Sequence, residues 1–181
     1  EIPDDIRRAY SKTCFPLRKT SSVSFTKPEK LHITLAFFKD LSSGQADMIR
    51  SILTDMNREH FEISCEKIGL FKRRGIPSAV FIQTASEILN EYAAALHKKL
   101  EYSGIAFDKK PFVPHITLAR INSAEDETAF KKIYSEIGKS FKKLSFQAAS
   151  VHLFSSNMIT YKKEFSIEFI VPQAQETESG E

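Results

Sequence analysis

The pentapeptide His-Ile-Thr-Leu-Ala occurs twice in the chain, beginning once at His32 and once at His115. Each copy alternates polar and apolar residues and predicts a β-strand. Side chains alternate between the two faces of a strand, so each histidine shares a face with the threonine two positions later, Thr34 or Thr117. Two such strands could bring two imidazoles and two hydroxyls to opposite walls of one groove.

This set of side chains suits the cleavage of a phosphodiester. A base must take a proton from the attacking water and an acid must protonate the leaving oxygen, and histidine performs both tasks near neutral pH. The two threonines could donate hydrogen bonds to the phosphoryl oxygens. Five positions after the histidines stand Arg120, a candidate phosphate ligand, and Phe37, which could stack on a nucleobase. An offset of five reaches the opposite face of an ideal strand, so both assignments require the strand to twist or end first.

Two other interpretations of these histidines compete with catalysis. A single His-x-Thr on a strand is usually a polar pair on a solvated face, but an identical pentapeptide in two matching places favours function. Histidines also bind metals, yet no Asp, Glu or Cys stands at ligand spacing, so we expect neither a metal nor another cofactor. His60, His97 and His152 lack the repeated context and are expected to be ordinary residues.

Composition is typical of an ordinary globular protein. With 181 residues the chain is long enough for one domain or two small lobes. The longest apolar runs, such as 93–96, are far shorter than a membrane span, and the first residues resemble no signal peptide. Cys14 and Cys65 have neither metal-ligand spacing nor the density of a disulfide scaffold, so we expect free thiols. These features predict a cytoplasmic protein without membrane association.

The charge distribution indicates a mildly basic body. Net charge is +3, but residues 173–181 contain three glutamates and no basic residue, so the rest of the chain carries +6. Such an excess suits a polyanion such as RNA. The basic clusters at 72–74 and 109–110 have two interpretations that the sequence leaves open: contact with a phosphate backbone, or a solvated loop that keeps the protein soluble.

Periodicity predicts one order of elements twice, strand-helix-strand-strand. The first unit has a strand at 31–38, a helix at 45–58 and strands at 61–65 and 79–84, followed by a further helix at 86–102; the second has a strand at 115–121, a helix at 126–138 and strands near 145–154 and 158–171. Ser123 followed by Asp126 resembles a capping arrangement for the helix at 126–138.

This duplication predicts the fold. The repeat units cover approximately 31–84 and 115–171, and we expect an α+β protein with two pseudo-symmetric lobes. Each lobe should be a small antiparallel sheet with helices on its outer face, and an active-site groove should lie between the lobes. Residues 1–172 should form a single bilobal domain, and residues 173–181 a polar, disordered tail.

Beyond the pentapeptides, several segments carry a family resemblance. The chain resembles the two-histidine phosphoesterase superfamily, with its paired HxTx motifs, and within it the LigT-type RNA 2′,3′-cyclic phosphodiesterases, also called 2′-5′ RNA ligases. The segments that carry the resemblance are 27–35, 69–71, 110–120 and 151–156.

The resemblance implies an RNA-processing hydrolase that converts an RNA 2′,3′-cyclic phosphate end to a 2′-phosphate without a metal, with reversible 2′-5′ ligation as related chemistry. It implies that His32 is the proton donor to the leaving ribose 3′ oxygen and His115 the proton acceptor that activates water. The other implied roles are phosphate binding by Thr34, Thr117 and Arg120 and a base contact by Phe37. The partner would be RNA, such as a tRNA fragment, or a small cyclic nucleotide, and the protein would be a monomer.

Two alternatives stay open. The protein could act on another cyclic or 2′-5′-linked nucleotide, or it could be a non-catalytic RNA-binding module that uses the basic loops and Phe37, Phe38 and Phe71. Family members usually open with a short apolar strand before a segment like residues 2–7. The sequence begins at Glu1, so either it lacks this strand or a neighbouring segment replaces it. A sheet short of the strand would have unpaired backbone at its edge.

Overall fold

A computed structural model describes residues 2–56, 60–124, 126–148, 150–159 and 162–172. The strands are β1 (Ser21–Phe25), β2 (Phe61–Arg73), β3 (Ile76–Ala85), β4 (His115–Ala124), β5 (Leu144–Ala148), β6 (Ser150–Ile159) and β7 (Lys162–Pro172). Within the described residues they form a five-stranded antiparallel sheet of order β1-β4-β3-β2-β5 and a two-stranded sheet, β6-β7.

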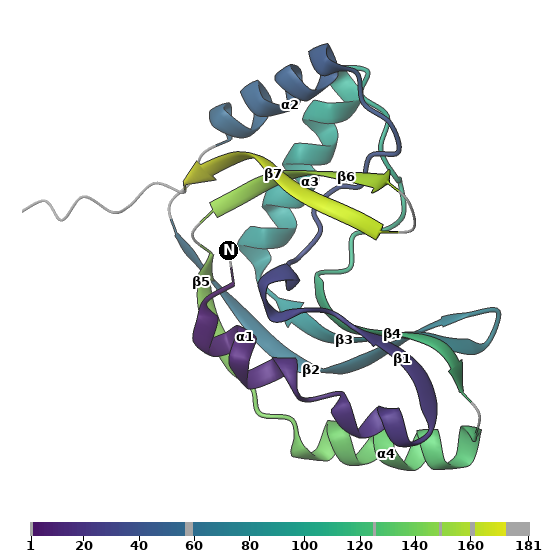
Figure 1. Ribbon diagram of the computed structural model, residues 1–181. Coiled ribbons are helices and arrows are strands. Elements are labelled where there is room, and N and C mark those ends of the chain that lie inside the picture. Colours follow the sequence, from purple (N-terminus) through teal and green to yellow (C-terminus); the bar gives the residue numbers. More distant parts are fainter. Residues whose placement is uncertain (1, 57–59, 125, 149, 160–161, 173–181) are drawn as a thin grey trace, which may run out of the picture.

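Helices cover both sheets. They are α1 (Asp4–Ser11), α2 (Ser43–Asp55), α3 (Glu87–Tyr102) and α4 (Glu127–Ser140), with short 3₁₀ helices η1 (Phe15–Lys19) and η2 (Pro28–Lys30). In Figure 1, α1 and α4 lie along the curled five-stranded sheet, while α2 and α3 lie with β6 and β7. The architecture confirms the predicted α+β class with two lobes, each a sheet and its helices.

Each lobe has its own apolar core. Ile6 of α1 and Phe130 of α4 are buried with Ile116 under the five-stranded sheet. Ile49 of α2 is buried in a second cluster with Leu96 of α3 and Leu153 of β6. Full burial of such a side chain stabilises the fold by roughly 1.5–3 kcal/mol, so the two clusters hold the helices against their sheets.

The lobes do not follow the sequence repeats. β2 and β3 come from the first repeat but pair with β5 and β4 from the second. Conversely, α2 and α3 from the first half of the chain share their apolar core with Leu153 of β6 from the second half. Each lobe is therefore assembled from both halves of the chain.

The three predicted helices are confirmed, with small differences at their ends. Ser42 caps α2 in a capping box with Gln45, as its side chain accepts a hydrogen bond from the Gln45 backbone N–H. The capping arrangement expected from Ser123 is wrong, since Ser123 lies within β4. Asp126 is itself the N-cap of α4, and its carboxylate accepts a hydrogen bond from the Ala129 N–H at 2.9 Å.

The strand predicted at 31–38 is wrong. This segment forms only an isolated bridge, between Ile33 and Ile116 of β4. Further along, the Leu35 carbonyl accepts a hydrogen bond from His97 Nε2 of α3 at 2.8 Å, and the Phe37 carbonyl accepts one from the Asp108 N–H at 2.9 Å. The segment leaves β4 because a side chain and a loop, rather than a second strand, take up its backbone carbonyls.

Several elements near the sheet edges were not predicted. Residues 4–30 form α1, η1, β1 and η2. In β1 only Val23 and Phe25 alternate with serines, and two apolar residues are too short a pattern to predict a strand. The strand expected near 145–154 is two strands, β5 and β6, which belong to different sheets. The basic residues 72–74 were expected in a loop, but β2 continues to Arg73.

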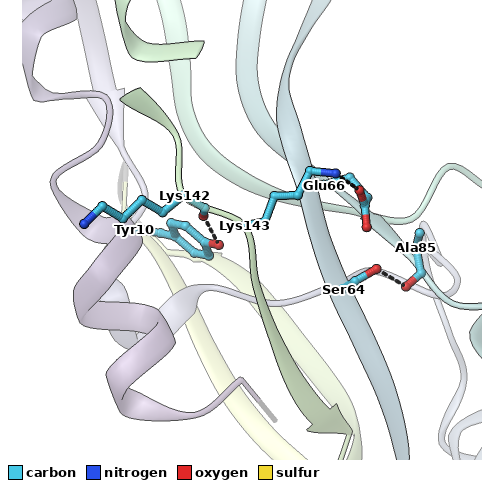
Figure 2. Close-up of polar contacts among 6 residues, drawn as sticks. All are labelled: Tyr10, Ser64, Glu66, Ala85, Lys142 and Lys143. Atoms are coloured by element: carbon cyan, nitrogen blue, oxygen red, sulfur yellow. Dashed lines mark hydrogen bonds and ion pairs between the residues drawn. The ribbon is translucent and has the colours of Figure 1, made fainter. Parts of the chain in front are cut away.

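Figure 2 shows two polar contacts at the residues just before the edge strand β5 and a third within the sheet. The Tyr10 hydroxyl donates to the Lys142 carbonyl at 2.9 Å, just before β5. Lys143 Nζ donates to Glu66 Oε2 of β2 at 2.6 Å and lowers the pKa of that carboxyl. Within the sheet, the Ser64 hydroxyl of β2 donates to the Ala85 carbonyl of β3 at 3.2 Å.

Both cysteines are free, as expected, and both are buried. Burial raises the pKa of the Cys14 thiol to about 12 and that of the Cys65 thiol to about 11. Both thiols therefore stay protonated at neutral pH and act as small apolar groups. In the described part of the chain, no helix combines the length and apolar character needed to cross a membrane.

Candidate active site

The bridge between Ile33 and Ile116 joins the two pentapeptides. Ile116 is buried in the core of the five-stranded sheet and Ile33 packs against the same core. Residues next to them in the sequence point to the opposite side, away from α1 and α4. The two pentapeptides therefore lie beside each other, rather than on opposite walls of a groove.

The antiparallel direction of the bridge sets the relation of the four polar side chains. On one side of the bridge His32 comes opposite Thr117, and on the other side Thr34 comes opposite His115. The two histidines are diagonal neighbours in this arrangement, with Cβ atoms roughly 7 Å apart. Each imidazole is thus close to the threonine of the other pentapeptide.

Both imidazoles are held in the same way. His32 Nδ1 lies 2.8 Å from the Lys30 carbonyl, and His115 Nδ1 lies 2.6 Å from the Val113 carbonyl. A carbonyl can only accept a hydrogen bond, so Nδ1 carries the proton in each ring. Nε2 is then the nitrogen that can accept or release a proton toward a substrate. The two copies thus share the hydrogen bond from Nδ1 to the carbonyl two residues earlier, as well as the pentapeptide sequence.

A β-bulge lies within β4. Phe81 of β3 pairs with Thr117, but the preceding residue Val80 pairs with Ala119. Leu118 is therefore an extra residue on β4, and the alternation of side chains resets at this point. Burial agrees, because Leu118 and Ala119 are consecutive residues and both belong to the same buried core.

The bulge brings Arg120 to the face of the histidine. Arg120 pairs with Ala79, and paired residues in an antiparallel sheet point to the same face. Ala79 is two residues before Phe81 on β3, so Arg120 shares its face with Thr117 and His115. The bulge supplies the change of face that an offset of five residues requires.

Aromatic rings pack around His115. Its ring centroid lies 4.9 Å from that of Phe71 and 5.3 Å from that of Phe81, both in edge-on geometry. Phe71 and Phe81 stack on each other at 4.1 Å. Gly69 pairs with Phe81 across β2 and β3, and a Cβ at position 69 would overlap the Phe81 ring. Glycine at this position therefore leaves room for the ring that packs on the histidine.

His32 has a more open environment. It is exposed, and its nearest described aromatic contact is Phe154 of β6, at 6.1 Å between ring centroids. Phe154 stacks in turn on His152 and remains 45% exposed. His32 on one lobe and Phe154 on the other place the site where the two lobes meet.

Phe37 lies apart from the paired histidines. It is 59% exposed, and among the described residues no ring contact joins it to His32 or His115. Its carbonyl is bonded to the loop that follows α3. The predicted contact of Phe37 with a base stays a prediction.

Sequence reasoning missed three residues of this site. The ring of Phe81, which lies beside His115, gave no signal that distinguished it from core aromatics. Phe154 lies in the segment 151–156 that carries the family resemblance, but the sequence assigned it no role. Gly69 did carry a signal, since a glycine inside a run of β-forming residues often marks a close approach. Of the residues described, no group of three or more His, Cys, Asp or Glu side chains is arranged to hold a metal ion.

Comparison with known proteins agrees with this geometry. The model of the 2′-5′ RNA ligase superfamily matches residues 9–158. The chain belongs to this superfamily. An Archaeoglobus fulgidus protein named RNA 2′,3′-cyclic phosphodiesterase is 31% identical over 130 residues, 71% of this chain and 73% of the relative. An Aeropyrum pernix protein of the same name is 31% identical over 135 residues, 74% of this chain and 73% of the relative.

Two solved structures share the fold. The TT0787 protein of Thermus thermophilus superposes with a TM-score of 0.79 at 19% identity, over 97% of this chain and 95% of that one. LigT of E. coli, crystallised with 3′-AMP, superposes with a TM-score of 0.74 at 17% identity and the same coverage. At such identity the likeness supports the LigT-type fold and says nothing of individual residues.

Proposed function

We propose that this protein hydrolyses the 2′,3′-cyclic phosphate end of RNA to a 2′-phosphate. The observation that carries the proposal is the bridge that sets two identically oriented imidazoles on one face, each near the threonine of the other pentapeptide. The names of the superfamily relatives support the same activity. The finer assignment of roles follows the family resemblance.

In the proposed reaction, His115 is neutral and His32 is protonated before attack. His115 Nε2 removes a proton from water as the water oxygen forms a bond to phosphorus. The bond from phosphorus to the ribose 3′ oxygen breaks, and His32 Nε2 donates its proton to that oxygen. The product carries a 2′-phosphate and a 3′-hydroxyl, and the two histidines end with their protonation states exchanged.

The remaining side chains stabilise the charge on the phosphoryl oxygens. We assign Thr34 and Thr117 as hydroxyl donors, and Arg120 as a charge-assisted donor whose fork geometry matches two oxygens. Phe37 is assigned to the nucleobase. These donors would matter most where negative charge develops in the transition state.

We further propose that the reaction needs no metal, because two imidazoles already supply the acid and the base. The same pair could act on RNA in place of water. If the 5′-hydroxyl of a second RNA attacks the cyclic phosphate, the 3′ oxygen leaves as before and a 2′-5′ linkage forms. The reverse steps would cleave that linkage.

The test is incubation with a short RNA that ends in a 2′,3′-cyclic phosphate, with EDTA present, followed by identification of the terminal phosphate. We expect complete conversion to the 2′-phosphate. A 3′-phosphate product would reverse the assumed orientation of the substrate. Activity that disappears with the chelator and returns with zinc would remove the metal-independent mechanism. RNA that binds equally well with or without a cyclic end, and stays uncleaved, would favour the binding module.

A further inference from the structure

The hairpin of β2 and β3 ends in a basic tip. The two residues of its turn, Arg74 and Gly75, both have positive φ, at 53° and 82°. Such a pair makes the tight turn that suits a two-residue hairpin. Figure 1 shows this hairpin, in teal, extending outward from the five-stranded sheet. Lys72, Arg73 and Arg74 are all exposed.

The sheet register places Arg73 on the face of the active site. Phe71 pairs with Ala79, and both share the face that carries Arg120. The register then shifts by one residue on β3, and β2 keeps its alternation. Arg73, two residues beyond Phe71, therefore points to the same face of the sheet as Phe71.

Lys72 points the other way, toward α4. The pKa of Glu127, at the start of α4, is lowered mainly by its hydrogen bond to Lys131 and also by the positive charge of Lys72. α4 covers the core face of the sheet. The two neighbouring cations thus serve opposite faces, and only Arg73 adds its charge to the face of the histidines.

The tip also differs from the second basic cluster of the chain. Lys109 forms an ion pair with Glu101 at 3.0 Å, and Lys110 forms one with Asp108 at 2.7 Å. Among the ion pairs within the described residues, none involves Arg73 or Arg74. The cluster at 109–110 is neutralised locally, whereas the tip retains its charge for an external anion.

The tip is also close to the reacting centre. The Phe71 ring lies 4.9 Å from the His115 ring, and two strand residues advance the chain by roughly 7 Å from Phe71 to Arg73. A strand of a few nucleotides covers this separation. A mononucleoside 2′,3′-cyclic phosphate has a single phosphate, which the histidines would hold, so it offers no backbone phosphate to the tip.

We propose that Arg73 and Arg74 bind backbone phosphates of the RNA upstream of its cyclic end, as the strand runs across the face of the sheet from His115 toward the hairpin tip. The inference rests on the proposed function and deepens it. It makes the tip a determinant of substrate length: the enzyme prefers an oligonucleotide with a cyclic end over a mononucleoside 2′,3′-cyclic phosphate.

The experiment compares R73A/R74A with K132A/K139A, which removes two exposed charges from α4 on the other side of the same sheet. Each variant is assayed with adenosine 2′,3′-cyclic phosphate and with a ten-nucleotide RNA ending in a 2′,3′-cyclic phosphate. We expect R73A/R74A to lower kcat/KM about tenfold for the RNA and to leave the mononucleotide within twofold. The dependence of log kcat/KM on log salt should become shallower by about 1.4 for the RNA, as expected when a single strand loses two phosphate contacts. K132A/K139A should match the unmodified protein on both substrates.

Two outcomes would overturn the inference. One is an unchanged ratio of kcat/KM for the two substrates, whether or not both values fall, and the other is an equal loss of RNA activity in K132A/K139A. Failure of the proposed function looks different, since the unmodified protein would then cleave neither substrate. In that case fluorescence anisotropy with the same RNA decides. R73A/R74A must bind the RNA more weakly than K132A/K139A does, and equal affinity again overturns the inference.

Discussion

The two copies of His-Ile-Thr-Leu-Ala have identical sequences but different backbone structures. The copy that begins at His115 opens β4 and pairs with β3, and its last residue, Ala119, also pairs with Phe25 of β1. The copy that begins at His32 keeps one bridge to β4 and then turns toward α3. A strand requires hydrogen-bonding partners on its edges, and the same residues form a ladder only where the fold supplies them.

What the two copies share is the way each histidine is held. In both, Nδ1 bonds to the carbonyl two residues earlier, at Lys30 or Val113. This contact depends on the residues just before the histidine and not on the strand. Local chain geometry thus reproduces the orientation of the imidazole in two different backbone environments.

The packing around the rings is where the copies differ most. His115 is half-buried against Phe71 and Phe81, whereas His32 is exposed and approached only by Phe154 among the described aromatic rings. We infer that the position of His115 depends on the packing of the Phe71 and Phe81 rings, which β2 and β3 carry on the face of the active site. The position of His32 depends on its backbone hydrogen bond and on the meeting of the two lobes.

The largest effects should come from replacing each histidine in turn, which tests whether His32 and His115 are equally necessary for the reaction. H32A and H115A should each lower the rate on RNA 2′,3′-cyclic phosphate by about 10²–10⁴-fold, the usual effect of losing a positioned acid or base. The pH dependence of the rate separates the roles: H115A should lose the limb that requires a deprotonated base, and H32A the limb that requires a protonated acid. Full activity in either variant would end the two-histidine assignment, and exchanged limbs would reverse the roles.

The residues five positions after the histidines should differ in effect. R120A removes a charged donor aimed at the phosphoryl oxygens and should lower kcat by about 10²-fold, as for a single oxyanion donor. F37A should mainly raise KM for nucleotide substrates, by about fivefold to tenfold, because base stacking contributes about 1–3 kcal/mol and the exposed Phe37 ring should lie at the lower end of that range. Steady-state kinetics on the cyclic RNA separates the two. If R120A, like F37A, raises KM and leaves kcat unchanged, then Arg120 binds the substrate without stabilising the transition state.

Replacing Gly69 tests the dependence of His115 on packing. In G69A the new methyl overlaps the Phe81 ring, and we expect a loss of about 1–3 kcal/mol in stability from the displaced ring. Activity should fall about tenfold, and the pH profile should change in the limb assigned to His115 and not in that of His32. G138A is the matched control, since a Cβ there meets nothing within 4 Å and alanine favours the helix α4. If G69A leaves both the limb and the stability unchanged, Phe81 does not position His115.

The smallest effect should come from the hydrogen bond between His97 of α3 and the Leu35 carbonyl, which holds the segment of the first copy. H97A removes the donor to the Leu35 carbonyl, and we expect a loss of about 1 kcal/mol in stability together with a few-fold loss of kcat. H60A, at an exposed histidine, serves as the control in the same urea denaturation and rate measurements. A loss of activity as large as that of H32A would give His97 a more direct role than holding the segment.

The sequence alone was sufficient where the signal is local. The 3.6-residue spacing of apolar side chains predicted α2, α3 and α4, as Ile49, Ile52 and Leu53 illustrate on the buried face of α2. The repeated pentapeptide by itself indicated the two histidine-threonine pairs, and together with the segments 69–71 and 151–156 it carried the family resemblance. Helix periodicity and a five-residue motif each depend on residues that are close together in the sequence, so the sequence shows them directly.

Only the tertiary structure decided how these parts meet. The β-bulge at Leu118 turns Arg120 to the face of His115, and it is defined by register against β3, about forty residues earlier in the chain. The segment after His32 has strand-like residues but forms no ladder, since its carbonyls bond to His97 and to a loop. Pairing, register and bulges depend on partners distant in sequence, so periodicity could not reveal them. The assembly of each lobe from both halves of the chain has the same cause.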